Sequence, residues 1–438
     1  MAGGRPNKSD RSDLSDTSDT SDTSDTSDLG RPPGFPFGQK SKSTRLVQIM
    51  AKPPAPVRLG IVGFGNMGRF HAEYLRAGKT VGAELVAVCD VNPDALRHPL
   101  AQGLAAYGDS RKLIRSGTVD AVIVATPHYD HTTIGIEALT AGLHVLVEKP
   151  ISVHTADCQR LIAAHKNKKQ VFAAMFNQRS SPVYAKVREL VRNGELGGLV
   201  RVNWIVSDWF RTQAYYDSGT WRATWAGEGG GVLMNQCPHN LDLLQWICGM
   251  PRRVRAFCKL GARHRIEVED QVTAYLEYDN GATGVFITST GEAPGTNRLE
   301  IAGERGKLLV ENGKIRFYRN ETQADEFLRT SPQGFGAPPV WNIEIPVPAE
   351  QPQHQVLMQG FVDAIRLGTP LLAPASEGIH SVELANAMLY SSALETTVEL
   401  PLDAAAYEKE LKRWITNSKL KKTPAKKITG NFGASFQK

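Results

Sequence analysis

The chain has 438 residues, of which 41% are hydrophobic and 22% are charged, and its formal net charge is +6. These values are ordinary for a globular protein, and the length allows two or three domains. The small net charge gives no reason to invoke nucleic acid or a membrane surface as a partner, because such partners are bound by a concentrated basic stripe.

The cysteines are scattered and odd in number, and no two of them have C-x-x-C spacing. They are Cys89, Cys158, Cys237, Cys248 and Cys258. This pattern argues against a disulfide framework and against a zinc site. Free thiols indicate a reducing compartment, so we expect a cytoplasmic protein without a bound metal. No apolar run approaches the roughly 18 residues of a membrane span, and we expect no secretion signal.

The first fifty residues differ in composition from the rest. A Ser-Asp-Thr triplet repeats between Ser15 and Asp28, and apolar residues are rare there. Such a polar, acidic segment cannot offset its ordering entropy, so residues 1–55 are expected to be disordered. Met50 directly precedes the globular pattern. It is either the natural start of the protein or an internal residue after a genuine acidic tail, and N-terminal mass analysis separates the two.

Strands and helices alternate from Val57 onward. Short apolar runs predict strands at residues 57–62, 85–89, 121–125, 145–147 and 171–175, and helical patterns cover residues 67–77, 132–141 and 156–165. Continuous apolar runs are typical of strands that are buried on both faces of a parallel sheet. The β-α-β order therefore predicts a doubly wound α/β Rossmann domain over residues 56–176.

The pattern changes after Leu199. Residues 200–206 alternate between apolar and polar positions, which is typical of a sheet with two different faces. Asn280-Gly281 and Asn312-Gly313 each lie between two predicted strands and indicate hairpins. We expect an α+β domain with a mainly antiparallel sheet over residues 177–403, including a helix at 378–394. A C-terminal helix and a lysine-rich tail follow at residues 404–438.

The run Gly63-Phe64-Gly65-Asn66-Met67-Gly68 matches G-x-G-x-x-G between the first predicted strand and helix. Such glycines permit a tight turn, a close approach to a pyrophosphate and close helix packing, and the helix N-terminus attracts phosphate. Asp90 closes the next strand, where a carboxylate binds the ribose hydroxyls of NAD. We therefore predict NAD as the cofactor, while Arg97 leaves NADP possible.

Lys149 follows the predicted strand at 145–147 and precedes Pro150. Ligands of an open parallel sheet gather at the carboxyl ends of its strands, so this lysine is expected to face the cofactor. A positively charged nicotinamide nearby would lower its pKa and suit it to proton transfer. Spacing alone favours the alternative of a surface lysine that precedes a proline.

A second polar stretch follows the triple glycine at residues 229–231. Asn235 and His239 are four residues apart and would share one face of a helix. His239 is a candidate acid or base near neutral pH. The local sequence also fits a buried, hydrogen-bonded histidine without a catalytic role.

Together these motifs resemble the Gfo/Idh/MocA oxidoreductases over roughly residues 57–402. The resemblance rests on the glycine run, Thr126-Pro127 with His131, Glu148-Lys149-Pro150, and the triple glycine followed by His239 and Asp242. It implies that Thr126, Pro127, His131, Glu148 and Lys149 help to bind NAD. Lys149 would also be the catalytic lysine, and His239 would be the acid/base histidine. It also implies sugar or cyclitol substrates and a homodimer or homotetramer.

One position departs from the family pattern. Many members carry Asp four residues before the histidine, whereas this chain has Asn235, whose amide cannot take a proton. As a member of the catalytic set with Lys149 and His239, Asn235 can only orient a substrate hydroxyl or His239. For the substrate pocket we select residues that bind or stack on a polyol, namely Asn177, Arg179, Trp221, Arg222, Asn235 and His239, with Gln178 and Tyr215 as further candidates. Aromatic residues of this region equally fit core packing.

Three functions remain open on the sequence. The first is an NAD(P)-dependent dehydrogenase that interconverts a secondary alcohol and a ketone on a sugar, cyclitol or sugar derivative. The second uses NAD without net consumption, as in glycoside cleavage by transient oxidation. The third is a non-catalytic nucleotide-binding sensor, which the amide of Asn235 favours and the presence of Lys149 and His239 opposes.

Overall fold

Two sheets organise residues 55–420, the part of the chain that the computed structural model describes. The predictions for the acidic repeat, for Met50 as a start and for the lysine-rich end of the chain lie outside these residues. None of the described helices is long and apolar enough to cross a membrane.

The first sheet is parallel throughout and has six strands. They are β1 (Val57–Val62), β2 (Ala83–Cys89), β3 (Ala105–Tyr107), β4 (Ala121–Val124), β5 (His144–Val147) and β6 (Phe172–Ala174). Their order, β3-β2-β1-β4-β5-β6, is that of doubly wound dinucleotide-binding domains. The chain leaves β1 toward one side and returns to β4 on the other, so a crevice for ligands is expected where these two strands end.

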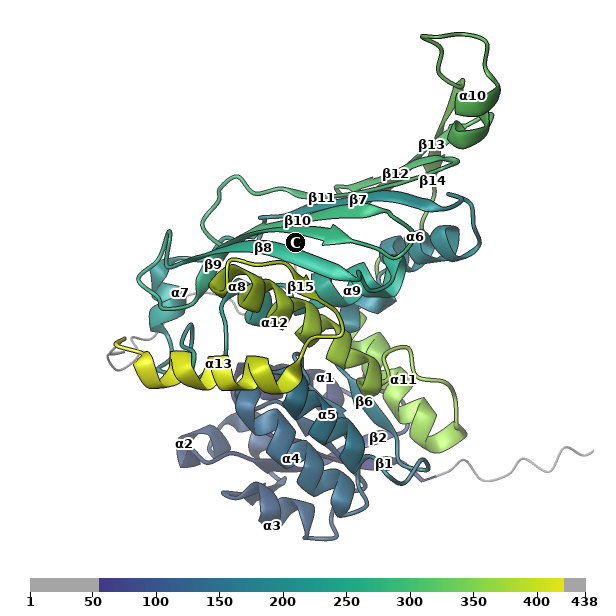
Figure 1. The fold of residues 1–438 in the computed structure, drawn as a ribbon. Coiled ribbons are helices and arrows are strands. Elements are labelled where there is room, and N and C mark those ends of the chain that lie inside the picture. The colour runs from purple at the N-terminus through teal and green to yellow at the C-terminus, as the bar shows by residue number, and fades with distance from the viewer. Residues whose placement is uncertain (1–54, 421–438) are drawn as a thin grey trace, which may run out of the picture. The chain divides into compact units, whose positions relative to one another are not determined.

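Helices cover both faces of this sheet, which is why its central strands are continuous apolar runs (Figure 1). All four residues of β4 are buried. The helical segments are α1 (Asn66–Arg76), α2 (Pro93–Leu96), η1 (Pro99–Ala101), α3 (Ser110–Ile114), α4 (His128–Thr140) and α5 (Thr155–Ala164). The predicted Rossmann topology is confirmed.

The second sheet has nine strands in the order β14-β13-β12-β11-β7-β10-β9-β8-β15. They are β7 (Leu199–Val206), β8 (Arg253–Leu260), β9 (Glu269–Glu277), β10 (Thr283–Ser289), β11 (Asn297–Gly303), β12 (Gly306–Glu311), β13 (Lys314–Asn320), β14 (Val340–Ile345) and β15 (Val398–Glu399). Only β7 and β10 pair in parallel, so the expected mainly antiparallel sheet is confirmed. Both predicted hairpins are present, and Asn312 and Gly313 each have the positive φ that a type I′ turn requires.

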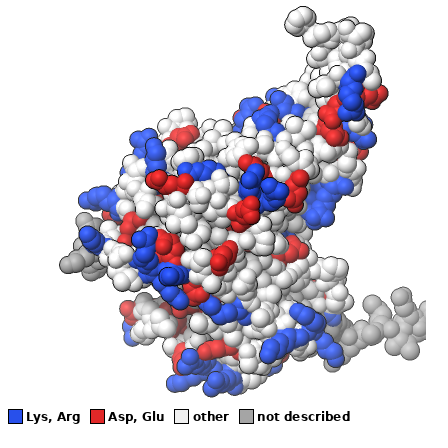
Figure 2. Space-filling view, viewed as in Figure 1, with Lys and Arg blue, Asp and Glu red and all other residues white. Residues whose placement is uncertain are grey.

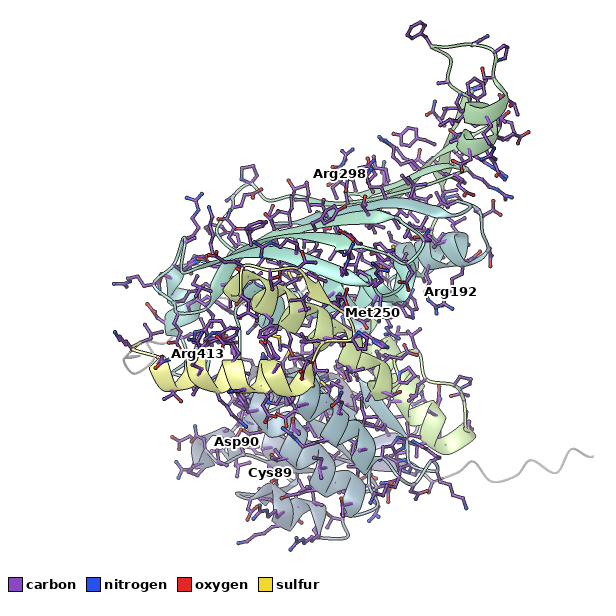
Figure 3. The ribbon with its side chains drawn as sticks, viewed as in Figure 1. Cys89, Asp90, Arg192, Met250, Arg298 and Arg413 are labelled. Carbon is purple, nitrogen blue, oxygen red and sulfur yellow. The ribbon has the colours of Figure 1, made fainter. Side chains whose placement is uncertain are left out.

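One face of the second sheet is covered and the other is bare of helices (Figure 1). On β7, Val202, Trp204 and Val206 are buried toward the helices, while the intervening residues are only partly buried. Figure 3 shows Arg298 of β11 on the outer face. The remaining helical segments are η2 (Asn177–Ser180), α6 (Pro182–Arg192), α7 (Gln213–Asp217), α8 (Val232–Asn235), α9 (Pro238–Cys248), α10 (Ala324–Thr330), α11 (Gln353–Leu367), η3 (Ala375–Gly378), α12 (Ile379–Ala393) and α13 (Ala404–Asn417).

The C-terminal helices connect the two sheets. Helix α12 packs against β8 of the second sheet and α5 of the first, and α11 contacts β1. Asn386 on α12 accepts from the backbone N–H of Thr155 at 3.0 Å and donates to the carbonyl of Val153 at 3.2 Å. Because these late segments return to the first sheet, the domain boundaries at residues 176 and 403 stay predictions.

A buried ion pair ties η2 to α9. The guanidinium of Arg179 binds both carboxylate oxygens of Asp242, at 2.8 and 2.7 Å, and also contacts Glu377 at 2.5 Å. The side chains of Arg179 and Asp242 are essentially inaccessible. Removing one partner of such a pair leaves an uncompensated charge in the interior.

We therefore expect Asp242→Asn to lower the free energy of unfolding by about 3–5 kcal/mol, which urea titration with a fluorescence or circular dichroism readout measures. The matched control is Asp120→Asn, which weakens a bidentate pair with Arg58 at the surface and should cause no comparable loss. Equal stability of the two variants would contradict a structural role for the Arg179–Asp242 pair.

Candidate active site

The glycine run forms a cradle between β1 and α1. Gly63 has φ +92°, and a Cβ there would lie 2.5 Å from the carbonyl oxygen of Ala125. A Cβ on Gly68 would lie 2.0 Å from the carbonyl oxygen of Gly63, so only glycine lets α1 begin this close to the strand. A Cβ on Gly65 would meet no heavy atom within 4 Å, so the backbone here is open to a ligand.

The N-terminus of α1 has the electrostatics of an anion site. Gly65 is the N-cap residue, so no side chain caps the helix, and the first turn carries no acidic residue. Asn66 is exposed and Met67 is partly buried. Unused backbone N–H groups and the positive end of the helix dipole fit the diphosphate of a dinucleotide.

Asp90 lies directly after β2, beside this cradle (Figure 3). One carboxylate oxygen accepts from the backbone N–H of Phe64 at 2.7 Å, and the other accepts from the N–H of Asn92 at 2.8 Å. These bonds hold the carboxylate where it can bind ribose hydroxyls. Arg97, the residue that left NADP possible, forms a surface ion pair with Asp94 at 2.7 Å.

The end of β4 offers a second set of groups. The hydroxyl oxygen of Thr126 is buried and finds no hydrogen-bond partner among the described residues. The two ring nitrogens of His131 lie 2.8 Å from the carbonyl oxygens of Thr126 and Pro150. Burial lowers the pKa of His131, and a neutral imidazole donates to only one carbonyl at a time. His131 thus ties the loop after β4 to the loop after β5, with Pro127 at the N-cap of α4 between them.

Glu148, at the end of β5, belongs to a buried cluster that the sequence did not predict. Its Oε1 lies 2.7 Å from Nε2 of His71 on α1, and Nδ1 of His71 lies 2.6 Å from the hydroxyl of Tyr74. Burial by itself raises the pKa of Glu148, but the hydrogen bond from His71 and the nearby His354 and Lys149 hold it below its ordinary value. The cluster fixes the strand that carries Lys149 against the helix that begins at the cradle.

Lys149 is partly buried and is followed by a cis peptide bond to Pro150. Its Nζ donates to the backbone carbonyl of Asn235 at 2.8 Å. Burial lowers the pKa of Lys149, and the positive charges of Arg222 and Arg211 add to this effect, while the carboxylates of Glu148 and Glu228 oppose it. The amine is therefore easier to deprotonate than an exposed lysine.

Asn235 and His239 do not share one helix, so that expectation is wrong. Asn235 ends α8 and His239 lies in the first turn of α9, because Pro238 lacks an N–H and interrupts the helix. In an unbroken helix the carbonyl of Asn235 would accept from the N–H of His239. Here the same carbonyl accepts from Lys149, so the break supplies the amine's hydrogen-bond acceptor.

His239 is buried, and its Nδ1 has no hydrogen-bond partner among the described residues. Burial lowers the pKa of His239 well below its ordinary value, and the positive charge of Lys149 acts in the same direction. The alternative of a core histidine with all of its ring nitrogens hydrogen-bonded therefore does not fit Nδ1 of His239. A buried, unpaired nitrogen is costly, which suits a group that is paired when a ligand binds.

The side chain of Asn235 lies in a polar network. Its Oδ1 accepts from the hydroxyl of Tyr215 at 3.3 Å and from Nε2 of Gln236 at 3.2 Å, and its Nδ2 donates to Glu228. Arg222 donates to the hydroxyl of Tyr215 at 2.9 Å. Both lone pairs of the Asn235 amide oxygen are thus engaged, which favours an orienting role.

The other predicted substrate residues divide into two groups. Trp221 packs against Arg222, whose guanidinium lies 4.6 Å from its ring centroid, and against His128, so these residues border the network. Asn177 donates to Gln353 at 2.9 Å and leaves a buried Oδ1 without a partner among the described residues. Arg179 is instead saturated by Asp242 and Glu377, and its assignment to the substrate pocket stays a prediction that this geometry does not favour.

Two buried acids, Glu269 and Glu228, lie around the triple glycine, and neither was predicted as a site residue. Glu269 accepts from the backbone N–H groups of Gly231 and Leu233 at 2.8–2.9 Å and so caps α8. Glu228 is 1% exposed, and its backbone oxygen contacts Nδ1 of His128 at 3.2 Å. A glutamate before a glycine run normally indicates a solvated loop, so no local signal distinguishes these acids.

Loop 219–231 also packs against helix α13. The rings of Trp225 in this loop and Trp414 on α13 have centroids 4.7 Å apart. The carbonyl of Trp225 accepts from the hydroxyl of Tyr129 on α4 at 2.8 Å. Helix α4, loop 219–231 and α13, the last of the described helices, therefore contact one another here.

Two family models match this chain. The model described as the oxidoreductase family with an NAD-binding Rossmann fold matches residues 57–176, and the GFO/IDH/MocA C-terminal domain matches residues 184–309. The first range contains the cradle, Asp90 and Lys149, and the second contains Glu228, Asn235 and His239.

Individual relatives agree with these matches. A myo-inositol 2-dehydrogenase of Thermotoga maritima is 28% identical over 271 residues, covering 58% of this chain and 75% of the relative. A 1-carboxy-3-chloro-3,4-dihydroxycyclohexa-1,5-diene dehydrogenase of Comamonas testosteroni is 30% identical over 283 residues, covering 62% and 67%. The WlbA dehydrogenase from Bordetella pertussis, solved with NADH and UDP-GlcNAcA, superposes with a TM-score of 0.67 at 26% identity and covers 80% of this chain and 100% of its own. The chain therefore belongs to the Gfo/Idh/MocA family of NAD-binding oxidoreductases.

Proposed function

We propose that the protein interconverts a secondary alcohol and a ketone on a sugar, cyclitol or sugar derivative, with NAD as the redox partner and Lys149 as the proton-transfer group. The observation that carries this proposal is the environment of the amine. Lys149 Nζ donates to the carbonyl of Asn235 at the carboxyl edge of the first sheet, and burial lowers its pKa. The open cradle at Gly65 and the unpaired Thr126 hydroxyl lie after neighbouring strands of the same edge.

The proposed chemistry follows from the two ways in which a neutral amine forms hydrogen bonds: its N–H groups donate and its lone pair accepts. A backbone carbonyl only accepts, so it takes an N–H of Lys149 and leaves the nitrogen lone pair free to point elsewhere. A neutral Lys149 can then take the proton of a substrate hydroxyl, while bound NAD supplies the hydride acceptor. His239, kept neutral by burial, pairs its free Nδ1 with the same or an adjacent hydroxyl.

The substrate class is supported by the lining and by relatives. Tyr215, Trp221 and Arg222 offer aromatic faces beside hydrogen-bond donors, a combination that suits a hydroxylated ring. The Thermotoga maritima relative is named for myo-inositol, and the Bordetella pertussis structure holds UDP-GlcNAcA. We extend this class to the present chain, without choosing a particular sugar or carbon.

We further propose that the protein is a cytoplasmic homodimer or homotetramer that associates through the bare face of the second sheet. On that face Phe257 is 59% exposed and Tyr275 is 41% exposed, on the neighbouring strands β8 and β9. Figure 2 shows acidic and basic residues interspersed on the side of the molecule that is in view. Five free thiols support a reducing compartment.

Replacing Lys149 by Met should reduce kcat for polyol oxidation by about 10²–10⁴-fold, because the proton acceptor is lost. NADH affinity, measured by fluorescence titration, should change little. Lys186→Met is the control, since Lys186 pairs with Glu189 at the surface. Equal turnover of Lys149→Met and wild type across a broad polyol panel would remove Lys149 from the mechanism. NAD that copurifies and is not consumed during turnover would favour the recycled-cofactor alternative.

The two directions of the reaction should depend on pH with opposite signs. Alcohol oxidation needs neutral Lys149 and should rise with pH through its pKa, whereas ketone reduction needs the ammonium and should fall through the same pKa. Because burial lowers this pKa, both limbs should lie below the ordinary lysine range. Profiles of kcat/KM in both directions test this expectation, and limbs of the same sign would contradict it.

Cofactor choice should depend on the charge of Asp90. Asp90→Asn keeps an oxygen that can accept from the N–H of Phe64 but removes the repulsion of a 2′-phosphate, so the NADH-to-NADPH preference should fall about tenfold or more. Dissociation constants for both reduced cofactors measure the ratio. Asp279→Asn, at an exposed turn, should leave it unchanged. An unaltered ratio in Asp90→Asn would place cofactor selection elsewhere.

A further inference from the structure

Glu228 is a buried carboxylate in the loop that precedes the triple glycine, and its side chain has partners on both oxygens. Oε2 accepts from the backbone N–H of Ala223 at 2.5 Å, and Oε1 accepts from Nδ2 of Asn235. Arg222 lies 3.8 Å from Oε1. A carboxylate with 1% exposure is expensive to bury, so its retention needs these partners.

We propose that Glu228 is a positioning residue of the active site, which orients the amide of Asn235 and supplies the negative charge that offsets the arginines beside Lys149. This proposal rests on the proposed function, because it concerns the same proton-transfer group. Glu228 acts through Asn235 and through its charge, and it is not assigned a contact with substrate.

The orientation of Asn235 follows from its neighbours. A carboxylate can only accept, so it fixes the NH₂ end of the Asn235 amide toward Glu228. The amide oxygen is thereby turned toward the two donors Tyr215 and Gln236. The backbone carbonyl of this same residue holds Lys149 Nζ. Glu228 thus fixes the residue that carries the lysine's acceptor.

The charge argument includes the ionisable groups that face Lys149 from each packed element. The acidic groups near Lys149 are Glu148 and Glu228, and the arginines near it are Arg222 and Arg211. Burial lowers the pKa values of His128, His239 and His354, so these histidines are neutral. Burial raises the pKa of Glu228 above its ordinary value, and Arg222, the N–H of Ala223, Asn235 and Lys149 offset part of this rise by favouring the carboxylate. Without Glu228, the positive charges of Arg222 and Arg211 on Lys149 would be opposed by Glu148 alone among these groups.

This arrangement also accounts for the amide at position 235. Two carboxylates in direct contact cannot both stay ionised, because each raises the pKa of the other. With an acid at 228 bonded to residue 235, an amide at 235 avoids that conflict. The negative charge of this pair of residues is then carried by Glu228 alone.

The test compares Glu228→Gln, Glu228→Asp, Asn235→Asp and the double variant Glu228→Gln/Asn235→Asp. The pKa of Lys149 is measured from the pH dependence of its acetylation by trace acetic anhydride, quantified by mass spectrometry, since only the neutral amine reacts. The same variants give profiles of kcat/KM for polyol oxidation.

Loss of the charge in Glu228→Gln should move the pKa of Lys149 and the acid limb of oxidation down by about one unit. Glu228→Asp keeps the charge and should leave the limb in place while KM rises. Asn235→Asp should leave the limb near its wild-type position, because Glu228 and an acid at 235 in direct contact cannot both stay ionised. The double variant keeps one carboxylate at this pair of positions and should return the limb of Glu228→Gln to the wild-type position, which is the interaction a double-mutant cycle isolates. The matched control is Glu267→Gln, which removes another carboxylate that accepts a backbone N–H, from Trp225 at 2.9 Å, and should shift nothing.

The proposal is overturned if Glu228→Gln folds, as judged by its melting temperature and NADH affinity, and leaves the pKa of Lys149 unchanged. It is also overturned if Glu228→Gln does not fold and the double variant restores neither folding nor the pKa. The acetylation readout does not require turnover. If wild type binds no NAD and oxidises no polyol, the proposed function fails, while the effect of Glu228 on Lys149 is still decided.

Discussion

The hydrogen bond from Lys149 Nζ to the carbonyl of Asn235 joins the carboxyl edge of the parallel sheet to the helices beneath the antiparallel sheet. Its geometry depends on both sheets, since Lys149 follows β5 and Asn235 ends α8. A buried amine loses hydration, and this loss is tolerated only if polar partners replace the water. The other features of the site supply these polar partners or hold them in place.

Charge balance is the first of these features. The amine lies among acids and arginines whose effects on its pKa oppose one another, and burial lowers the pKa values of the nearby His239 and His354. Rigidity is the second feature. The Glu148–His71 contact and the two carbonyl contacts of His131 fix the loops after β4 and β5 relative to the first helix. A proton-transfer group needs a defined position as well as a suitable pKa, and here different residues provide the two properties.

The fold and the cofactor cradle could be derived from the sequence because their determinants are local. An apolar run, a glycine spacing and a terminal acid lie within a few dozen residues, and each has a steric or electrostatic cause. The Asn-Gly hairpins are equally local, because positive φ is needed at the turn itself. Pro238 was a local signal too, and it should have indicated that Asn235 and His239 lie on separate helices.

The remaining site residues could not be derived because their partners are distant in the chain. His71 reaches Glu148 across 77 residues, and Arg179 reaches Asp242 across 63. A polar residue after a strand can face a ligand or satisfy a buried charge, and only the packed structure decides between them. Arg179 was predicted for the substrate pocket, which stays a prediction, and its guanidinium is bound by Asp242 and Glu377. Glu228 looked like a solvated loop residue, but it is buried and its charge acts on Lys149.

The contact of Trp414 with Trp225 has a consequence for the order of assembly. The loop that carries Glu228 rests on the last described helix, so its geometry is completed only after nearly the whole chain has been synthesised and docked. Contacts of such large sequence separation form late, because loop closure must precede them. During refolding, the return of catalytic competence would therefore lag behind the recovery of nucleotide affinity, which needs only the first sheet and its glycine turn.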